Sequence, residues 1–186
     1  MADDDPGAAE RRARFEALAP ELVEPLRRFL ARRADPATAD DVLGETLLVC
    51  WRRLDDVPPD AALPWAYGVA RHCLANAQRS ARRQGRVAAR VATVDPPTQS
   101  SPGPGETQHG EERLHEALAR LTDTEAELVR LWAWEQLTPS EIAGVMDLTP
   151  NAVSIRLHRA REKLKEILRK DRPAAGHEES TEGRTP

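Results

Sequence analysis

The sequence has few cysteines and few aromatic residues. Two cysteines, Cys50 and Cys73, occur among 186 residues, and neither is followed by a second cysteine at the spacing of a zinc site. They are also too few for a disulfide framework, so both are expected to be small buried residues. Aromatic residues make up 4% of the chain and hydrophobic residues 40%, which favours small helical units over sheets.

Targeting segments and catalytic motifs are missing as well. No signal-peptide core precedes a cleavage site, and no apolar run is long enough to cross a bilayer, so the sequence predicts a cytoplasmic protein. We find no glycine-rich phosphate loop, no paired carboxylates with an orienting partner and no histidine-rich metal spacing. The prediction is therefore a protein that is not an enzyme and needs no cofactor or metal.

Charge is distributed unevenly along the chain. The formal net charge of −4 would argue against a nucleic-acid partner if it were spread evenly. Residues 69–94, however, contain six arginines and no acid, and residues 150–170 contain seven cations against two glutamates. The acids gather elsewhere, at residues 3–5, at 40–45 and in the tail. Local basic patches of this kind are typical of nucleic-acid-binding surfaces.

Residues 138–170 predict two helices joined by a tight turn. Thr138 opens the motif T-P-S-E, in which a proline occupies the first helical position and Glu141 can complete a capping box. Thr149 and Pro150 give a second helix-start signal a short distance later. Two starts this close together indicate a helix-turn-helix.

The second helix of this pair has a core face and an outward face. At about 100° per residue, four apolar residues fall on the core face: Val153, Leu157, Ala160 and Leu164. The outward arc and its flanks hold hydrogen-bonding side chains, one aliphatic residue and cations: Asn151, Ser154, Ile155, Arg156, His158, Arg159 and Arg161. A solvated amphipathic helix has a similar pattern, but the two caps favour a DNA-recognition helix, whose cations bind phosphates and whose Ile155 can contact a thymine methyl.

The first part of the chain is expected to be helical after a loose start. Residues 1–10 are acidic and small, so we expect them to be disordered. Residues 11–33 have helical spacing, but Pro20 and Pro25 are expected to divide this segment into two pieces.

Two further helices follow in the first half. Asp35 is a candidate N-cap for a helix through Arg53. A loop is expected at residues 54–59. Asp60 can cap a third helix, which is expected to end in the arginine run by Gly85.

A linker divides the chain into two parts. Residues 93–110 lack apolar periodicity and are rich in proline, glycine, serine and threonine, so they predict a flexible linker that no core crosses. A helix over 111–120 is expected next, and Thr122 with Glu125 forms another capping box. Residues 172–186 are polar and are predicted to be a disordered tail.

These features resemble a known family, the extracytoplasmic-function (ECF) group of sigma-70 factors, which are promoter-specificity subunits of bacterial RNA polymerase. The segments DDVLGETLLVCWRRL and WAYGVARHCLANAQR are similar to sigma region 2. The second half resembles sigma region 4 in the segment LTDTEAELVRLWAWEQLTPSEIAGVMDLTPNAVSIRLHRAREKL. Within it, E-I-A followed by V-S-x-R-L-x-R-A-R-E-K-L is a specific signature of that region. The resemblance implies an all-α protein with a region-2 domain at 11–92 and a region-4 domain at 111–171.

The resemblance also implies sites. Contacts to core polymerase are implied for three acids: Asp40, Asp41 and Glu45. Reading and melting of the minus-ten element is implied for His72, Asn76, Arg79, Arg82 and Arg83, with Arg86 also near phosphates. The loop 54–62 would hold a flipped base, without an aromatic residue to stack on. The outward arc of the recognition helix would read the minus-thirty-five element.

The chain departs from the family pattern at two of these positions. Gly44 stands where the family usually has glutamine, which removes a polymerase contact and lowers helix propensity by about 0.8 to 1 kcal/mol relative to alanine. His72 stands where the family usually has asparagine. The implied partners are core RNA polymerase, promoter DNA and an anti-sigma factor that wedges between the two domains.

Two other classes of protein remain open from the sequence. A conventional repressor or activator would use the same helix-turn-helix without binding polymerase, but its first domain would carry a ligand pocket or a dimer face. Here an acidic helix is followed by an arginine-rich one. An RNA-binding or hydrolytic protein is the third alternative, and the missing catalytic motifs argue against it.

Overall fold

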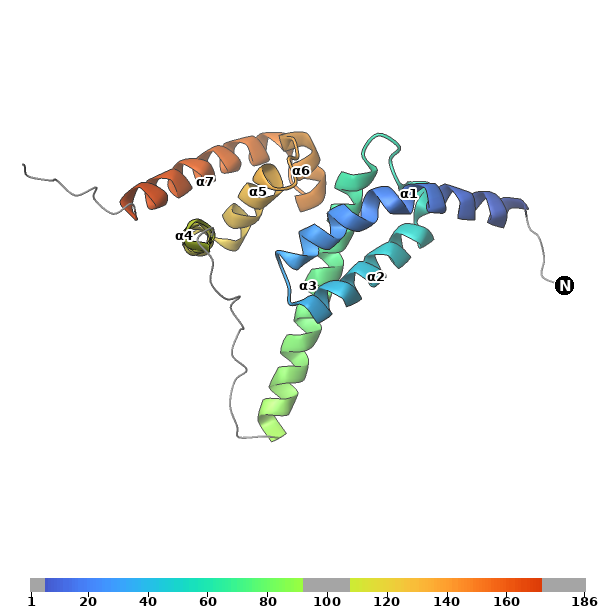
Figure 1. The fold of residues 1–186 in the computed structure, drawn as a ribbon, viewed down its shortest axis with the longest axis horizontal. Helices are drawn as coiled ribbons and strands as arrows, with labels where there is room; N and C mark the ends of the chain where they lie inside the picture. Colours follow the sequence, from blue (N-terminus) through green and yellow to red (C-terminus); the bar gives the residue numbers. More distant parts are fainter. Residues whose placement is uncertain (1–5, 92–107, 172–186) are drawn as a thin grey trace, which may run out of the picture.

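The regular structure of the described residues consists only of helices. The computed structural model describes residues 6–91 and 108–171. The elements in chain order are α1 (Pro6–Ala31), α2 (Pro36–Arg52), the 3-10 turn η1 (Leu54–Asp56), α3 (Ala62–Val91), α4 (Gln108–Ala119), α5 (Asp123–Ala133), α6 (Pro139–Met146) and α7 (Pro150–Lys170). Helices α1 to α3 pack together, and α4 to α7 form a second group (Figure 1). The predicted all-α fold with two helical domains is confirmed.

Helix α1 is continuous, although the sequence predicts a break at its prolines. Pro20 and Pro25 both lie inside it, and a proline in a helix interior costs about 3 kcal/mol. Four fully buried side chains lie near the prolines: Leu22, Leu26, Phe29 and Leu30. Burial of each stabilises the fold by roughly 1.5 to 3 kcal/mol. The predicted break is wrong because packing against α2 and α3 outweighs the local cost of the prolines.

The N-terminal end of α1 also begins earlier than predicted. Residues 6–10 are helical rather than disordered, and Pro6 occupies the first helical position, which proline tolerates well. Arg11, one turn later, donates hydrogen bonds to the carbonyls of Trp51 and Arg52 and so anchors this end to α2. Residues 1–5 lie outside the described part of the chain.

Helix α2 begins where the sequence places it. The N-cap is Asp35, whose Oδ1 accepts a hydrogen bond from the backbone N–H of Thr38 at 3.1 Å. Thr46 is the buried polar residue of the core, and its hydroxyl donates to the carbonyl of Val42 at 2.7 Å. This bond satisfies the hydroxyl within its own helix, so Thr46 is accommodated among apolar neighbours.

Helix α3 is packed in its first half, and residues 78–85 of its second half are largely exposed. Ala66 and Ala70 are fully buried, and the Tyr67 ring lies 4.9 Å from the Phe29 ring. The helix continues to Val91 rather than ending by Gly85 as predicted, because a glycine weakens a helix without stopping it. The second half therefore projects beyond α1 and α2 (Figure 1).

Three helices of the second domain begin at threonine N-caps. Thr122 and Thr138 each make the predicted capping box, with Glu125 and Glu141 respectively. Thr149 caps α7 by accepting from the backbone N–H of Ala152 at 3.3 Å. The helix-turn-helix is thus confirmed, and α6 and α7 both pack on α5.

The start of α4 differs from the sequence-based outline, whereas the end of α7 agrees with it. Helix α4 begins at Gln108, so residues 108–110 belong to it rather than to the linker. Helix α7 ends at Lys170, close to the predicted domain end. Residues 92–107 and 172–186, which include most of the expected linker and the expected tail, lie outside the described residues.

The two helical groups share one apolar core. Helix α3 packs against α6, and the buried residues of both groups form one cluster. At the contact, a Cβ placed on Gly68 would lie 3.7 Å from the Cα of Val145, so the two backbones approach closely. The expectation that no core crosses the linker is wrong, because Gly68 lets the backbones of α3 and α6 approach each other.

Candidate DNA and polymerase interfaces

The N-terminal half of α2 presents an acidic, solvent-facing surface. Asp40, Asp41 and Glu45 are all exposed, as the sequence predicts. Within the described residues no ion pair or hydrogen bond engages these three side chains. Gly44 lies among them, with open space where a Cβ would be. This surface is therefore free to meet a basic partner.

The predicted minus-ten residues form a stripe along α3. His72 and Asn76 lie one turn apart, and Arg79, Arg82 and Arg83 follow; all five are exposed. Asn76 Oδ1 accepts a hydrogen bond from Arg79 Nη2 at 2.6 Å, so the amide and the guanidinium are already oriented together. The structure brings these five residues onto one helix as predicted, whereas the side chain of Arg86 is not described.

The loop between α2 and α3 has a fixed first half. Leu54 in η1 is 1% exposed and anchors the loop to the core. Arg53 forms an ion pair with Asp56 at 2.9 Å, and its guanidinium lies 5.5 Å from the Trp65 ring centroid. The rest of the candidate base pocket, Val57 to Ala62, is half-buried or exposed. The loop thus offers an accessible surface on a rigid base.

The recognition helix α7 presents the predicted outward arc. Asn151, Ser154, Ile155, Arg156, His158 and Arg159 are exposed. Ile155 is 45% exposed, which is unusual for an aliphatic residue at the centre of a polar face. Ser154 Oγ donates to the carbonyl of Pro150 at 2.9 Å, so its hydroxyl offers acceptor lone pairs outward.

Arg161 differs from the rest of this predicted set. It is half-buried, and its guanidinium lies 4.1 Å from the Trp132 ring centroid. This stacking on α5 holds Arg161 at the flank of α7, away from the centre of the outward arc. The predicted contact of Arg161 with DNA stays a prediction. From this position, Arg161 could contact DNA only at the edge of the interface.

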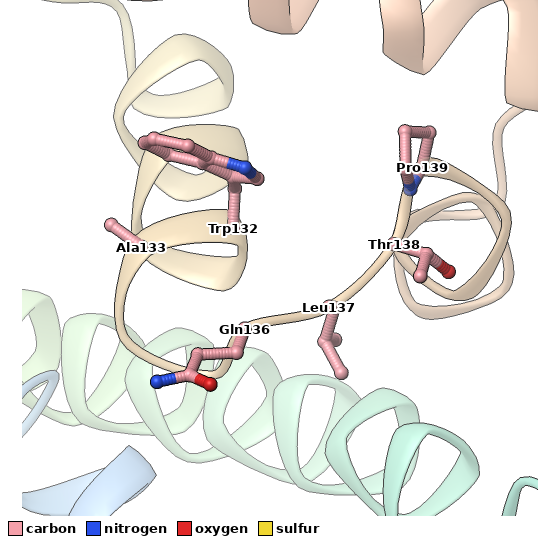
Figure 2. A pocket seen from close by; sticks show the side chains of 6 residues that line it. All are labelled: Trp132, Ala133, Gln136, Leu137, Thr138 and Pro139. Atoms are coloured by element: carbon pink, nitrogen blue, oxygen red, sulfur yellow. The ribbon is translucent and has the colours of Figure 1, made fainter.

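A groove of about 580 Å³ lies beside the helix-turn-helix (Figure 2). It is lined by residues from the end of α5, the connection and the start of α6: Trp132, Ala133, Gln136, Leu137, Thr138 and Pro139. Because the Arg161 guanidinium stacks on the Trp132 ring, one wall of the groove is in contact with the recognition helix. The sequence analysis did not single out this groove.

The N-terminal end of the α3 stripe contacts the helix-turn-helix. His72 Nε2 lies 3.4 Å from Asp147 Oδ2, and Arg71 Nη1 donates to the carbonyl of Val145 at 3.5 Å. Asp147 has the left-handed conformation, with φ of 54°, and terminates α6. The turn of the DNA-binding motif therefore lies against the first residues of the candidate minus-ten surface.

A charged cluster that the sequence analysis missed joins the domains. Arg33 Nε donates to Glu127 Oε1 at 3.1 Å, and its Nη1 donates to Glu135 Oε1 at 3.1 Å. Arg32 Nη2 donates to Glu135 Oε2 at 2.7 Å, and its guanidinium lies 5.4 Å from the Trp134 ring centroid. The side chains of Arg33 and Glu135 are 7% and 2% exposed, so these charges depend on one another rather than on water.

The two thiols are buried and chemically quiet. Burial raises the pKa of Cys50 to about 11 and also raises the pKa of Cys73, so both stay protonated near neutral pH. Among the described residues there is no cluster of three or more His, Cys, Asp or Glu side chains arranged to hold a metal ion. None of the helices described is both long and apolar enough to span a membrane.

Comparison with protein families gives matches in both domains. The model of "Sigma-70 region 2" matches residues 14–84, and that of "Sigma-70, region 4" matches residues 111–164. The RNA polymerase sigma factor CarQ of Myxococcus xanthus is 34% identical over 144 residues, which cover 75% of this chain and 80% of CarQ. The ECF RNA polymerase sigma factor SigL of Mycobacterium tuberculosis is 30% identical over 157 residues, which cover 82% of this chain and 88% of SigL.

Solved structures share the fold. The sigma factor RpoE of Bartonella quintana, in complex with the anti-sigma factor NepR, superposes with a TM-score of 0.63 at 20% identity, covering 85% of this chain and 98% of that one. CnrH, in complex with the cytosolic domain of CnrY, gives a TM-score of 0.56 at 23% identity, covering 84% and 88% of the two chains. The matched regions and the sequence identities, with the helix-turn-helix and the basic stripe of α3 in their expected places, show that this chain belongs to the ECF group of the sigma-70 family of RNA polymerase sigma factors.

Proposed function

We propose that this sigma factor directs promoter-specific initiation through three separate surfaces. The outward arc of α7 reads the minus-thirty-five element, the α3 stripe and the loop 54–62 bind the minus-ten element, and the acidic surface of α2 docks on core polymerase. The protein supplies no catalysis of its own and acts in the cytoplasm as a dissociable subunit. The proposed domain limits are 11–92 and 111–171.

The exposed arc of α7 is the observation that carries this proposal. A helix that packs only for stability has no need of an aliphatic side chain at the centre of its polar face, yet Ile155 is 45% exposed there. In a major groove the same side chain would contact a thymine methyl, and His158 beside it would reach a base edge. Arg156 is exposed on the flank of this arc, where phosphates lie.

The α3 stripe supports a role in strand separation. His72 and Asn76 carry hydrogen-bonding groups, and the arginines that follow supply cations for the backbone. A base extruded from the duplex would enter the loop 54–62, where hydrogen bonds and aliphatic contacts must hold it. Binding of the extruded strand then offsets the cost of unstacking.

The unpaired carboxylates of α2 support docking on a basic surface of the polymerase. Asp40, Asp41 and Glu45 would pair with cations of the partner, and each close charge pair at such an interface adds to affinity and to association rate. Because Gly44 removes a side chain from the middle of this surface, the acids carry more of the contact here than in relatives with glutamine.

Run-off transcription tests the proposal directly. Core polymerase is incubated with genomic promoter fragments, with and without the protein, and transcripts are mapped. Promoter-specific transcripts that depend on the protein support a sigma factor. A conventional helix-turn-helix regulator would instead change only the output of a polymerase that already carries another sigma factor. A lack of promoter-specific transcripts from core polymerase supplied with this protein would therefore favour that alternative.

An anti-sigma factor is the third proposed partner. Of the structural neighbours named above, RpoE is bound to the anti-sigma factor NepR, and CnrH is bound to the cytosolic domain of CnrY. The corresponding partner of this chain would be found by co-purification from the source cells. Release of transcription when that partner is removed would support its role as an inhibitor.

A further inference from the structure

The C-terminal end of α2 is held by two arginines from the N-terminal half of α1. The last carbonyls of a helix lack partners within that helix. Arg11 Nη2 donates to the carbonyl of Trp51 at 2.8 Å and to that of Arg52 at 3.0 Å. Arg14 Nη2 donates to the carbonyl of Leu54 at 3.0 Å. Two side chains from α1 therefore cap α2 and the η1 turn that follows it.

Asp55 completes this clamp. Its two carboxylate oxygens each accept a hydrogen bond at 3.0 Å, one from Arg11 Nη1 and one from Arg14 Nη1. The Trp51 ring lies below: its centroid is 5.3 Å from the Arg11 guanidinium and 5.4 Å from the Phe15 ring centroid, in an edge-on arrangement. Each guanidinium thus bonds a backbone carbonyl and a carboxylate at once, which fixes direction as well as distance.

The exposure of these groups shows what the clamp does. The side chains of Arg14 and Asp55 are 53% and 69% exposed, and that of Arg11 is 32% exposed. Ion pairs at such exposure contribute little to folding stability. The clamp instead fixes the path of the backbone at the point where α2 turns into the loop 54–62. Arg53 and Leu54 hold the same turn from the other side.

We propose that Arg11 and Arg14 are positioning residues that set the shape of the loop 54–62 for recognition of an unpaired minus-ten base. The inference rests on the proposed role of that loop. Because the loop has no aromatic residue to stack on, discrimination there depends on where its polar groups and aliphatic surfaces stand. A loop that is free to move would bind several bases about equally well.

The test compares minus-ten base preferences. A promoter library randomised at the minus-ten element is transcribed by core polymerase with wild-type protein, with Arg11→Ala plus Arg14→Ala, and with Arg12→Ala. Arg12 is exposed on the same helix turn and no contact of its side chain is seen among the described residues, so its variant removes a charge but leaves the clamp intact. We expect the clamp variant to flatten the preference at one or two positions by at least about fivefold, near the lower bound for one misread base. Arg12→Ala should match wild type.

A further variant distinguishes failure of the clamp proposal from failure of the proposed loop function. Replacement of residues 57–61 by glycines disrupts the candidate loop directly. If that variant loses minus-ten discrimination while the clamp variant keeps it, Arg11 and Arg14 do not position the loop, and the proposed loop function stands. If the glycine variant also keeps wild-type discrimination, the loop does not read the base, and both ideas are wrong.

Conservative substitution guards against a simple folding defect. Lysine at both positions keeps the charge but cannot make two directed bonds from one planar group. Arg11→Lys plus Arg14→Lys should therefore retain helical content and thermal midpoint yet show the same flattened preference. A double-lysine protein with wild-type preference would overturn the proposal, because charge alone would then suffice.

Discussion

Replacing Arg33 by alanine should open the contact between the two domains. In the closed arrangement this change leaves Glu127 and Glu135 without their shared cation at a site where Glu135 is 2% exposed. Breaking a buried pair in this way costs about 3 to 5 kcal/mol. In the variant Glu135 still has its ion pair with Arg32, at 2.7 Å. We therefore expect the closed arrangement to be destabilised by about 2 to 3 kcal/mol, at or slightly below the lower end of that range.

This cost applies to the closed arrangement, because opening would return both carboxylates to water. The ratio of closed to open protein should therefore fall by about 30- to 150-fold. The distance between fluorophores at Gly44→Cys in α2 and Ala119→Cys in α4 reports this ratio by energy transfer. Both sites are exposed, whereas Cys50 and Cys73 are buried and should resist labelling.

Two comparisons make the result decisive. Arg27→Ala removes an exposed arginine of the same helix whose partner Glu24 is 3.7 Å away and also exposed, so it should leave the distance unchanged. In a double-mutant cycle, Glu127→Ala should destabilise the closed arrangement much less in the Arg33→Ala background than in the wild type. An energy-transfer signal that is the same in wild type and in Arg33→Ala, across a denaturant range that opens the wild type, would refute the reasoning.

Three further predictions concern the proposed contacts. Asp41→Arg with Glu45→Arg should weaken binding to core polymerase by reversing charge at an exposed face, with unchanged circular dichroism; unchanged affinity would mean that this face is not the dock. His72→Ala should impair transcription from duplex promoters more than from a pre-melted bubble, because its proposed contact needs separated strands; equal defects on both templates would contradict this. Arg156→Ala should weaken binding to all promoters and reduce the salt slope by about 0.9, whereas Ile155→Ala should change the preferred upstream sequence and leave the slope nearly the same. A randomised upstream library that gives wild-type preference with Ile155→Ala would show that the helix does not read bases there.

Local signals in the sequence were sufficient to predict the starts of α2, α5, α6 and α7. Asp35, Thr122, Thr138 and Thr149 each cap a helix where the sequence places one. A cap depends on residues within three positions of one another, so it is visible without knowledge of the fold. The helix-turn-helix and the outward arc of α7 follow from such short-range patterns.

Long-range packing could not be predicted in the same way. Continuity of α1 through Pro20 depends on burial against α2 and α3, which the sequence does not specify locally. Arg33 and Glu127 are separated by 94 positions, and Arg14 and Asp55 by 41. Neither pair leaves a periodic signal, and charged residues at such separations are ordinarily taken for solvent-exposed ones. The domain contact and the loop clamp therefore become visible only in the structure.

If the α3 stripe binds promoter DNA as proposed, the contact of α6 with α3 makes α6 a competitor of that DNA. Promoter DNA laid along the α3 stripe would meet α6 at the end that holds His72, where Asp147 lies 3.4 Å away. Because α6 belongs to the same chain, its effective concentration beside α3 does not depend on how dilute the protein is. Dilution cannot relieve this competition. Only a partner that binds the separated domains better than the closed pair can do so, and such a partner would raise the affinity for DNA without touching the DNA itself.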